Sequence, residues 1–237
     1  MYAERHGLPV RSPASPEPVI TIDGPAGAGK STVGRQLARR LGFGRVDTGA
    51  LYRALAWAVR RARIAPLDTP DLRTLLNRTG VELVGERVLV DGQDVTAEIR
   101  TPEITELTSR LTTLGAVRDK MTPLQRELAA RGGVVLEGRD TGTVVWPEAE
   151  VKFYLVADLE TRARRRQAEL VSQGVTMELG EVRRDLAQRD RQDTERTLAP
   201  LRKPEGAVVI DTSGLAIEDV VDEMVKDVER ARCCTRS

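Results

Sequence analysis

Residues 19–32 read VITIDGPAGAGKST, a β-branched run that passes directly into a glycine-rich loop. The run at 19–22 is typical of a buried strand, and residues 24–31 match the phosphate-loop pattern G-x-x-x-x-G-K-[ST]. Glycine permits backbone angles that other residues avoid, so main-chain N–H groups can surround anionic oxygens while the following helix directs its positive end at them. The sequence therefore predicts a strand, a phosphate-binding loop and a helix in succession.

Two side chains of the loop have expected roles of their own. Lys30 is expected to reach the outer phosphates of a nucleotide, and the Ser31 hydroxyl to help hold a magnesium ion. A chance match in a glycine-rich turn is the alternative interpretation. The strand before the loop and the helix after it disfavour that alternative, because this is the context in which the pattern binds phosphate.

The composition indicates a globular protein without a strong net charge. The chain has 237 residues, 40% of them hydrophobic, which suits one domain or one domain with an insertion. Its 37 Lys and Arg nearly balance its 36 Asp and Glu, so no basic field indicates nucleic-acid binding. No stretch approaches the roughly 18 apolar residues of a membrane span, and the N-terminus lacks an apolar signal core. We therefore expect a cytoplasmic protein with no nucleic-acid or membrane partner.

Both ends of the chain are expected to lie outside any functional site. Residues 1–17 contain three prolines and no periodicity, and they predict a flexible leader in which nothing holds the lone His6 in place. Cys233 and Cys234 are adjacent, so they offer neither a disulfide framework nor the spacing of a zinc site. We interpret them as incidental thiols of a tail at 231–237.

Between these ends, strand and helix patterns alternate. Apolar runs predict strands at 19–22, 45–47, 134–137, 151–156 and 208–211. Apolar spacing and stop signals predict helices at 31–41, along Leu51, Leu55 and Val59, at 116–131 with a restart near Pro123, and at 159–173, 178–192 and 217–228. This alternation predicts a parallel sheet with helices on both faces, and such sheets bind ligands at the carboxyl ends of their strands.

The segment from residue 67 to about 110 interrupts that alternation. Thr69-Pro70 is typical of a helix start, and short strands are predicted at 81–84 and 88–90. Asp91-Gly92 is a strong hairpin signal after the second of these strands. A small antiparallel sheet is therefore expected as an insertion into the α/β chain.

Polar residues follow three of the predicted strands, at the edge where ligands bind. The strands end at Asp23, at Asp47-Thr48 and at Arg139-Asp140. Asp47 and Thr48 open a helix, so capping that helix is one interpretation of their presence. The other is that Thr48 and Arg53 hold a second phosphate opposite the first. Two facing phosphate sites would indicate phosphoryl transfer.

Arginines are concentrated in the helices that follow residue 156. Arg162, Arg165 and Arg166 share one helical face, and Arg189, Asp193 and Arg196 keep a similar periodicity. A solvated charged helix is the alternative interpretation of such a pattern. Transfer of a phosphoryl group needs positive charge around its oxygens and exclusion of water, and an arginine-rich helical lid meets both needs.

Four segments together resemble bacterial cytidylate kinases. They are GPAGAGKST at 24–32, DTGALYR at 47–53, GRDTGTVVWPEAEVKFYL at 138–155 and RDRQDTERTLAPL at 189–201. The resemblance runs from about Val19 to Arg230, and those enzymes are similar in carrying an inserted segment. It implies an α/β fold of the P-loop NTPase type, a parallel sheet flanked by helices. The kinase domain would span 18–230, with a nucleoside-monophosphate-binding insertion at about 67–115, holding the small antiparallel sheet, and a short helical lid at about 157–175.

The resemblance also implies substrates and the residues that bind them. A monomeric enzyme would use ATP with Mg²⁺ as phosphoryl donor and CMP or dCMP as acceptor. The ATP phosphates would be held by Gly24, Pro25, Ala26, Gly27, Ala28, Gly29, Lys30, Ser31 and Thr32. The acceptor phosphate would be bound by Thr48, Arg53 and Arg139, the sugar by Arg189 and Asp193, and the base by Ser109, Arg118, Asp140 and Arg196. Lys30, Arg162, Arg165 and Arg166 would neutralise the transferring group.

These base contacts agree with the chemistry of cytosine. Cytosine carries an amino donor beside ring acceptors, so Asp140 and Ser109 can accept from the amino group while an arginine donates to the ring. Uracil presents an oxygen at the position of that amino group. The residues are therefore expected to favour cytosine.

Two other classes of function are alternatives to a cytidylate kinase. The first is a kinase of the same fold that acts on AMP, dTMP or shikimate, and the second is a P-loop protein that uses ATP as a switch without catalysis. The first alternative is disfavoured by the residues that match base and sugar contacts of cytidylate kinases, which are Arg118, Asp140, Arg189, Asp193 and Arg196. The arginine-rich lid and the second phosphate site disfavour the second. Trp57 and Trp146 could stack on a base, but with 3% aromatic residues we expect packing or partial exposure.

Overall fold

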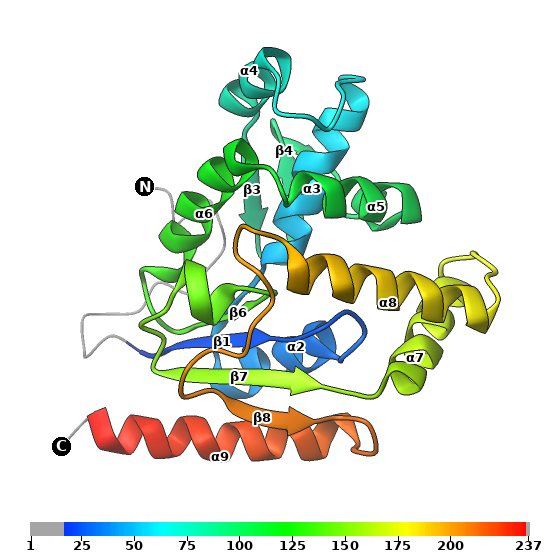
Figure 1. Ribbon diagram of the computed structural model, residues 1–237. Coiled ribbons are helices and arrows are strands. Elements are labelled where there is room, and N and C mark those ends of the chain that lie inside the picture. The colour runs from blue at the N-terminus through cyan, green and yellow to red at the C-terminus, as the bar shows by residue number, and fades with distance from the viewer. Residues whose placement is uncertain (1–16, 236–237) are drawn as a thin grey trace.

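The computed structural model describes residues 17–235, whose larger sheet has five parallel strands in the order β2-β6-β1-β7-β8 (Figure 1). These strands are β1 (Val19–Asp23), β2 (Gly44–Asp47), β6 (Val134–Glu137), β7 (Val151–Val156) and β8 (Val208–Asp211). In the register, Asp47 is paired with Glu137, and Asp23 with Tyr154. The carboxyl ends of the central strands therefore meet at one edge, as the strand patterns predict.

Helices cover both faces of this sheet. They are α2 (Lys30–Leu41), α3 (Thr48–Arg61), α6 (Gly115–Ala129) and α9 (Ile217–Thr235). Ile22 and Phe153 pack on one face with α2 and α9, whereas Val46 and Leu136 pack on the other with α3 and α6. Because the strands are apolar on both faces, each face forms a separate core, and the predicted parallel sheet covered on both sides is confirmed.

The inserted segment forms a small subdomain around α3, in the upper part of Figure 1. Its elements are α4 (Pro70–Arg78), β3 (Val81–Val84), β4 (Arg87–Val90), β5 (Gln93–Asp94), the short helix η1 (Glu98–Arg100) and α5 (Pro102–Leu111). The three strands are antiparallel, and Asp91 and Gly92 join the last two with φ of 51° and 80°. Positive φ at both turn positions is what the Asp-Gly signal predicts.

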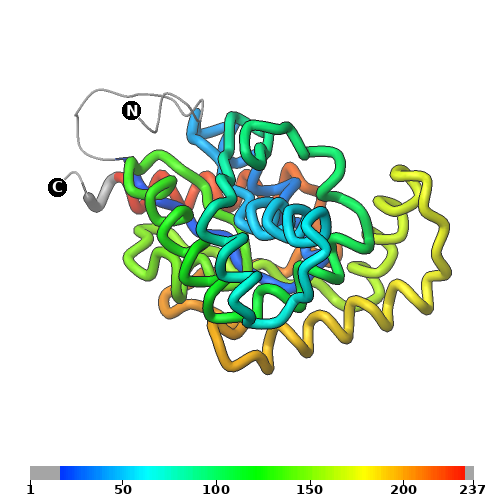
Figure 2. Tube along the Cα trace, turned by 90° about the horizontal axis from the view of Figure 1, so that it is seen from above, coloured from blue at the N-terminus to red at the C-terminus, as the bar shows by residue number. Residues whose placement is uncertain are grey.

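Two further helices, α7 (Leu159–Ser172) and α8 (Leu179–Glu195), form an arm that projects from the body of the protein (Figure 2). Ala163, Leu170, Val182 and Leu186 are buried between them in a small core of their own. This pair contacts the phosphate loop through Ala26, which belongs to the same apolar cluster. The arm is therefore held at the edge of the sheet where the strands end.

Three local features differ from the sequence-based expectations. The restart near Pro123 is wrong: α6 is continuous, with Pro123 inside it, because Met121 and Leu128 hold both of its halves in the core. Helix α5 was not predicted, and neither was η2 (Thr141–Val145), a single π-helical turn. Trp57 and Trp146 are partly buried against the core, as expected.

The structure describes only part of the two predicted chain ends. His6 and the rest of the expected leader as far as residue 16 lie outside the described residues. At the other end, α9 continues through Cys233 and Cys234 to Thr235. Within residues 17–235, no helix is both long enough and apolar enough to span a membrane.

Candidate active site

The phosphate loop follows β1 and leads directly into α2. Gly24, Gly27 and Gly29 have φ of 147°, 77° and 90°, a region of backbone space that favours glycine. Gly29 is the N-cap of α2, so the helix begins at Lys30 with its positive end directed at the loop. The strand, loop and helix predicted from residues 19–32 are confirmed.

Gly24→Ala is expected to destabilise the protein strongly. A Cβ at this position would lie 2.1 Å from the carbonyl oxygen of Leu155 on β7, and that backbone is fixed by the sheet. We expect the free energy of unfolding to fall by more than about 2 kcal/mol in urea denaturation. Gly85→Ala is the matched control, because Gly85 also has a positive φ, 62°, but its added Cβ would meet no heavy atom within 4 Å. Equal losses in the two variants would refute the steric explanation.

Lys30 is buried beneath the loop. Its Nζ donates to the carbonyl oxygens of Gly24, at 2.8 Å, and Pro25, at 2.6 Å. Burial lowers the pKa of Lys30 well below its usual value, the positive charge of Arg139 adds to that effect, and nearby carboxylates oppose it. A cation with so little solvation interacts strongly with any anion that enters the loop.

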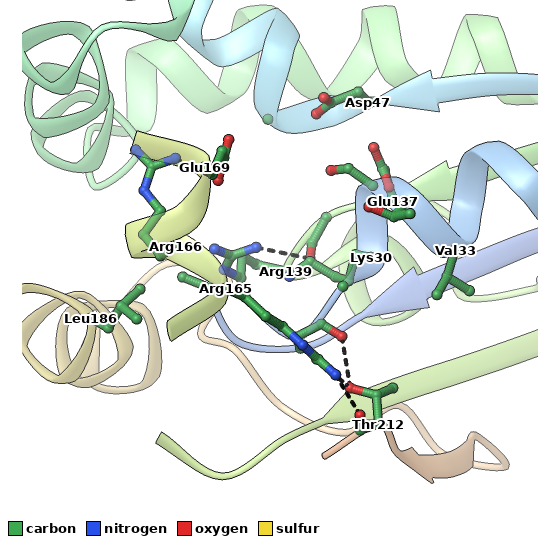
Figure 3. A pocket seen from close by; sticks show the side chains of 18 of the residues that line it. Lys30, Val33, Asp47, Glu137, Arg139, Arg165, Arg166, Glu169, Leu186 and Thr212 are labelled. Carbon is green, nitrogen blue, oxygen red and sulfur yellow. Dashed lines mark hydrogen bonds and ion pairs between the residues drawn. The ribbon is translucent and has the colours of Figure 1, made fainter. Parts of the chain in front are cut away.

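A cavity of about 450 Å³ joins the loop to the ends of the neighbouring strands (Figure 3). Residues 26–33, Arg165, Thr212 and Ile217 line the part of the cavity at the loop, Asp47 and Arg53 line the part at the end of β2, and Arg139 lies between them, near Lys30 (Figure 3). The cations on its wall are Lys30, Arg53, Arg100, Arg139, Arg165, Arg166 and Arg189. The carboxylates there are Asp47, Glu137 and Glu169. This excess of positive charge suits ligands that carry several phosphates.

Asp47 and Thr48 both bond to the backbone, and of the two only Asp47 lines the cavity. The Asp47 carboxylate accepts from the Ala50 N–H at 2.8 Å, so it caps α3, and its other oxygen lies 3.2 Å from Nη2 of Arg53. The Thr48 hydroxyl donates to the Glu137 carbonyl oxygen at 2.7 Å. The capping interpretation is therefore confirmed for Asp47, and Arg53 is directed into the cavity beside it.

Beside the cavity, five predicted residues form a network of alternating charges. Asp140 pairs with Arg118 and lies 3.5 Å from Nη2 of Arg196. Asp193 lies 3.6 Å from Nη1 of Arg196 and accepts from Nε of Arg139 at 2.8 Å. This cluster thus brings together three segments that are distant in sequence, at residues 118, 139–140 and 193–196. Buried charges are costly unless they are paired, and each member of this cluster is paired.

Electrostatic shifts follow from this packing. Burial alone would raise the pKa of the Asp193 carboxyl, but Arg139 and Arg196 hold it below its usual value. Burial lowers the pKa of Arg189 to about 10, and the positive charge of Arg139 adds to the effect. Arg189 makes no ion pair or hydrogen bond with any other described residue, so its donors face the cavity uncommitted. An anion that binds there would supply the hydrogen-bond acceptors and the negative charge that the Arg189 guanidinium lacks.

Ser109 lies on α5, apart from the charged network. Its hydroxyl donates to Oε1 of Gln192 on α8 at 3.0 Å. This bond connects the inserted subdomain to the arm, across 83 residues of sequence. Ser109 is therefore placed where the inserted subdomain meets the helix that carries Asp193.

The three predicted lid arginines have different partners. Arg162 is buried, pairs with Asp190, and donates to the carbonyl oxygens of Ala157, at 3.0 Å, and Ala26, at 3.1 Å; it does not line the cavity. Arg165 donates to the hydroxyl of Thr212 at 2.9 Å and to its carbonyl oxygen at 2.6 Å (Figure 3).

The third, Arg166, lies 2.7 Å from Glu169, and both side chains line the cavity. Arg165 and Arg166 thus bring positive charge to the cavity wall, whereas Arg162 contacts the phosphate loop itself. Asp190 also accepts from the Ala26 N–H at 3.4 Å, so the arm holds the loop from both the N–H and the carbonyl side.

Asp23 has a structural role that the sequence did not predict. Its wholly buried carboxylate accepts from the N–H and hydroxyl of Thr141, at 2.8 and 2.9 Å, and from the N–H of Gly142, at 2.8 Å. Burial raises the pKa of Asp23, although these hydrogen bonds oppose the shift. Its place at a strand end indicated the correct edge of the sheet, but no sequence pattern indicated the Thr141 turn as its partner.

The oxygen atoms on the cavity wall fit a magnesium ion that retains water. Ser31 opens α2 on the cavity wall, and Asp47, Glu137 and Glu169 supply carboxylate oxygens there. The described residues contain no group of three or more Asp, Glu, His or Cys placed to hold a metal by themselves. Mg²⁺ prefers oxygen ligands and is usually bound through one or two protein groups, water and substrate phosphates. The donor set therefore suits an ion that arrives with a nucleotide.

Comparison with known proteins identifies the family. The model of the cytidylate kinase family matches residues 20–230. The chain is 46% identical over 215 residues to the cytidylate kinase of Carboxydothermus hydrogenoformans, covering 89% of this chain and 97% of the relative. It is 48% identical over 220 residues to that of Geobacter sulfurreducens, covering 90% and 94%. A solved structure of an uncharacterized protein from Eubacterium ventriosum is alike in fold, with a TM-score of 0.50 and 11% identity over 90% of this chain and 99% of that chain. The chain belongs to the cytidylate kinase family.

Proposed function

We propose that the protein transfers the γ-phosphoryl group of ATP to CMP and dCMP, yielding ADP and CDP or dCDP. One observation carries the proposal: a single cavity is lined by the phosphate loop and by two further arginines, Arg53 beside Asp47 and Arg139 after β6. A phosphate bound at the loop and a phosphate bound by these arginines would face each other across a short gap. Family membership supplies the pair of nucleotides.

ATP is the ligand proposed for the loop end. The N–H groups of residues 24–32 and Lys30 would surround its phosphates. Leu215 and Ile217 line the same end and are 43% and 39% exposed, so an adenine base placed there would cover apolar surface that solvent now reaches. Arg165 lies between the phosphates and that surface in this arrangement.

CMP is the ligand proposed for the part of the cavity at the end of β2. Arg53 and Arg139 would bind its phosphate beside Thr48, and Arg189 and Asp193 its sugar hydroxyl. The base would be read by Asp140, which accepts from the cytosine amino group, and by the arginines on either side of it, Arg118 and Arg196, which donate to the ring. Ser109 would contact the base from the inserted subdomain. Uracil would turn an oxygen toward the Asp140 carboxylate, and this repulsion favours cytosine.

The reaction needs no covalent intermediate and no general base. A CMP phosphate oxygen, already anionic near neutral pH, forms a bond to the γ-phosphorus as the bond to the bridging oxygen of ADP breaks in line. Lys30, Arg165 and Arg166 neutralise the charge on the transferring group. In this conformation Arg162 contributes by holding the loop at Ala26. Mg²⁺, when bound near Ser31, supplies further charge neutralisation to the phosphates.

A coupled assay for ADP release tests this function. We expect turnover with Mg·ATP and CMP or dCMP that exceeds turnover with UMP, AMP, dTMP or shikimate. Equal turnover with AMP would favour another acceptor for the same fold. Turnover that is independent of every acceptor would favour the ATP-dependent switch. We further propose that the enzyme acts as a monomer in the cytoplasm, and sedimentation of the purified chain checks the first of these statements.

Asp193→Ala is expected to weaken CMP binding more than ATP binding. Asp193 contacts Arg139, which lines the cavity, and Arg196, which lies in the charged cluster beside it, so its loss removes the sugar contact and misplaces two further side chains proposed to bind CMP. We expect the KM for CMP to rise by about tenfold or more while the KM for ATP changes little. Asp185→Ala is the matched control, because Asp185 is an exposed residue of the same helix. Equal rises in both KM values would refute the assignment.

A further inference from the structure

The inserted subdomain reaches the cavity through only two of its described residues, Arg100 and Thr105. The Thr105 hydroxyl donates to the Thr101 carbonyl oxygen at 3.0 Å, so it serves its own helix. Arg100 is thus the cation that this subdomain places on the cavity wall. The sequence motifs did not single it out.

The backbone of Arg100 is fixed although its side chain is exposed. The preceding residue, Ile99, is completely buried in the core that includes α3. The following residue, Thr101, caps α5 by accepting from the Ile104 N–H at 3.3 Å. Arg100 itself donates its backbone N–H to the Ala97 carbonyl oxygen at 3.2 Å. A fixed turn therefore presents an exposed guanidinium to the cavity.

The Arg100 guanidinium has no ion pair or hydrogen bond among residues 17–235, in contrast to Arg53 and Arg139. Arg53 is engaged by Asp47, and Arg139 by Asp193. Burial raises the pKa of the Asp47 carboxyl, but Arg53, Arg45, the Ala50 N–H and Arg100 together hold it below its usual value. The charge of Arg100 therefore acts at the part of the cavity that Asp47 lines.

We propose that Arg100 is a third arginine that binds the phosphate of the nucleoside monophosphate, alongside Arg53 and Arg139. This assignment rests on the proposed function and names a further binding residue for it. A phosphate monoester carries about two negative charges and three terminal oxygens, more acceptors than two already engaged arginines satisfy. Arg100 has five uncommitted N–H donors in a planar fork that matches two of those oxygens. Because Arg100 belongs to the inserted subdomain, the acceptor phosphate also ties that subdomain to the sheet.

Steady-state kinetics of three variants test the proposal. Arg100→Met removes the charge and keeps the aliphatic length, and Arg100→Lys keeps the charge without the fork. Arg87→Met is the matched control, because Arg87 is an exposed arginine of the same subdomain that does not line the cavity. We expect Arg100→Met to raise the KM for CMP by about tenfold, with the KM for ATP unchanged and Arg100→Lys between Arg100→Met and the unsubstituted protein.

Calorimetric binding of cytidine, which lacks the phosphate, separates a phosphate contact from a contact with base or sugar. We expect Arg100→Met to bind CMP more weakly and cytidine as the unsubstituted protein does. A normal KM for CMP in Arg100→Met, or an equal loss of CMP and cytidine binding, would overturn the assignment. If the unsubstituted protein showed no CMP-dependent turnover, the proposed function would fail first, and the two failures are therefore distinguishable.

Discussion

Lys30→Ala is expected to lower kcat on the order of a thousandfold while the protein remains folded. The Lys30 amine is buried within the loop, directly beneath the proposed phosphate site. It donates hydrogen bonds to the carbonyl oxygens of Gly24 and Pro25. Removing it deletes a positive charge in a poorly solvated place, where charge acts most strongly on a transferring phosphoryl group. Stability should change little, because a buried lysine loses hydration when the chain folds and its removal relieves that cost.

Turnover with saturating Mg·ATP and CMP measures the effect, and thermal unfolding measures the fold. Lys203→Ala is the matched control, because Lys203 is exposed and lies outside the cavity. Near-native turnover of Lys30→Ala would refute the role of the loop lysine. A variant that is both inactive and unfolded would contradict the expected stability, and Lys30→Met then separates the loss of charge from the loss of side-chain volume.

Asp140→Ala is expected to impair both folding stability and recognition of CMP. Asp140 pairs with Arg118 and Arg196, and all three side chains are less than a tenth exposed. In the variant, the positive charges of Arg118 and Arg196 would remain buried without the Asp140 carboxylate. We therefore expect the free energy of unfolding to fall by about 3 kcal/mol. The carboxylate proposed to accept from the cytosine amino group would also be lost. We therefore expect the KM for CMP to rise by about a hundredfold.

Urea denaturation and steady-state kinetics measure these two effects separately. Asp140→Asn keeps the shape of the side chain and provides a second variant if Asp140→Ala folds poorly. The matched control is Asp119→Ala on α6, because Asp119 is exposed and makes no ion pair in the described part of the chain. An unchanged ratio of kcat/KM for CMP to that for UMP in Asp140→Asn would argue against Asp140 as the residue that reads the base.

Much of the fold could be predicted because its signals are local. The residues from Val19 to Thr32 carry a strand, a loop and a helix in one contiguous pattern, and the structure has all three. Asp91-Gly92 likewise demands positive φ at two adjacent positions, which leaves few alternatives to a hairpin. In such stretches the residues that determine the backbone are neighbours in sequence.

Other elements depend on contacts between distant segments and could not be predicted. Helix α5 lies within a segment dominated by strand signals, and the turn η2 is fixed by Asp23, 118 residues earlier in the chain. Pro123 indicated a helix break, but packing of the residues around it keeps α6 continuous. Tertiary packing outweighs local preference in these places.

The candidate site shows the same division. Sequence motifs indicated the residues that line the cavity or form the charged cluster beside it, such as Arg53, Arg139 and Asp193. They did not indicate that Arg162 contacts Ala26, or that Asp190 is its partner, because helical periodicity assigns a face and not the neighbour of that face. The cavity-lining position of Arg100 likewise follows from how the inserted subdomain packs on α3.

Direct transfer between two nucleotides is tested by incubating the protein with CMP and Mg·ATP labelled at the γ-phosphate. Nucleotides and inorganic phosphate are separated over the course of the reaction. We expect the label to appear in CDP, one for each ADP formed, with none in inorganic phosphate beyond the background without protein. Label released as inorganic phosphate at the same rate with and without CMP would contradict a phosphoryl-transfer site built from two facing phosphate-binding ends.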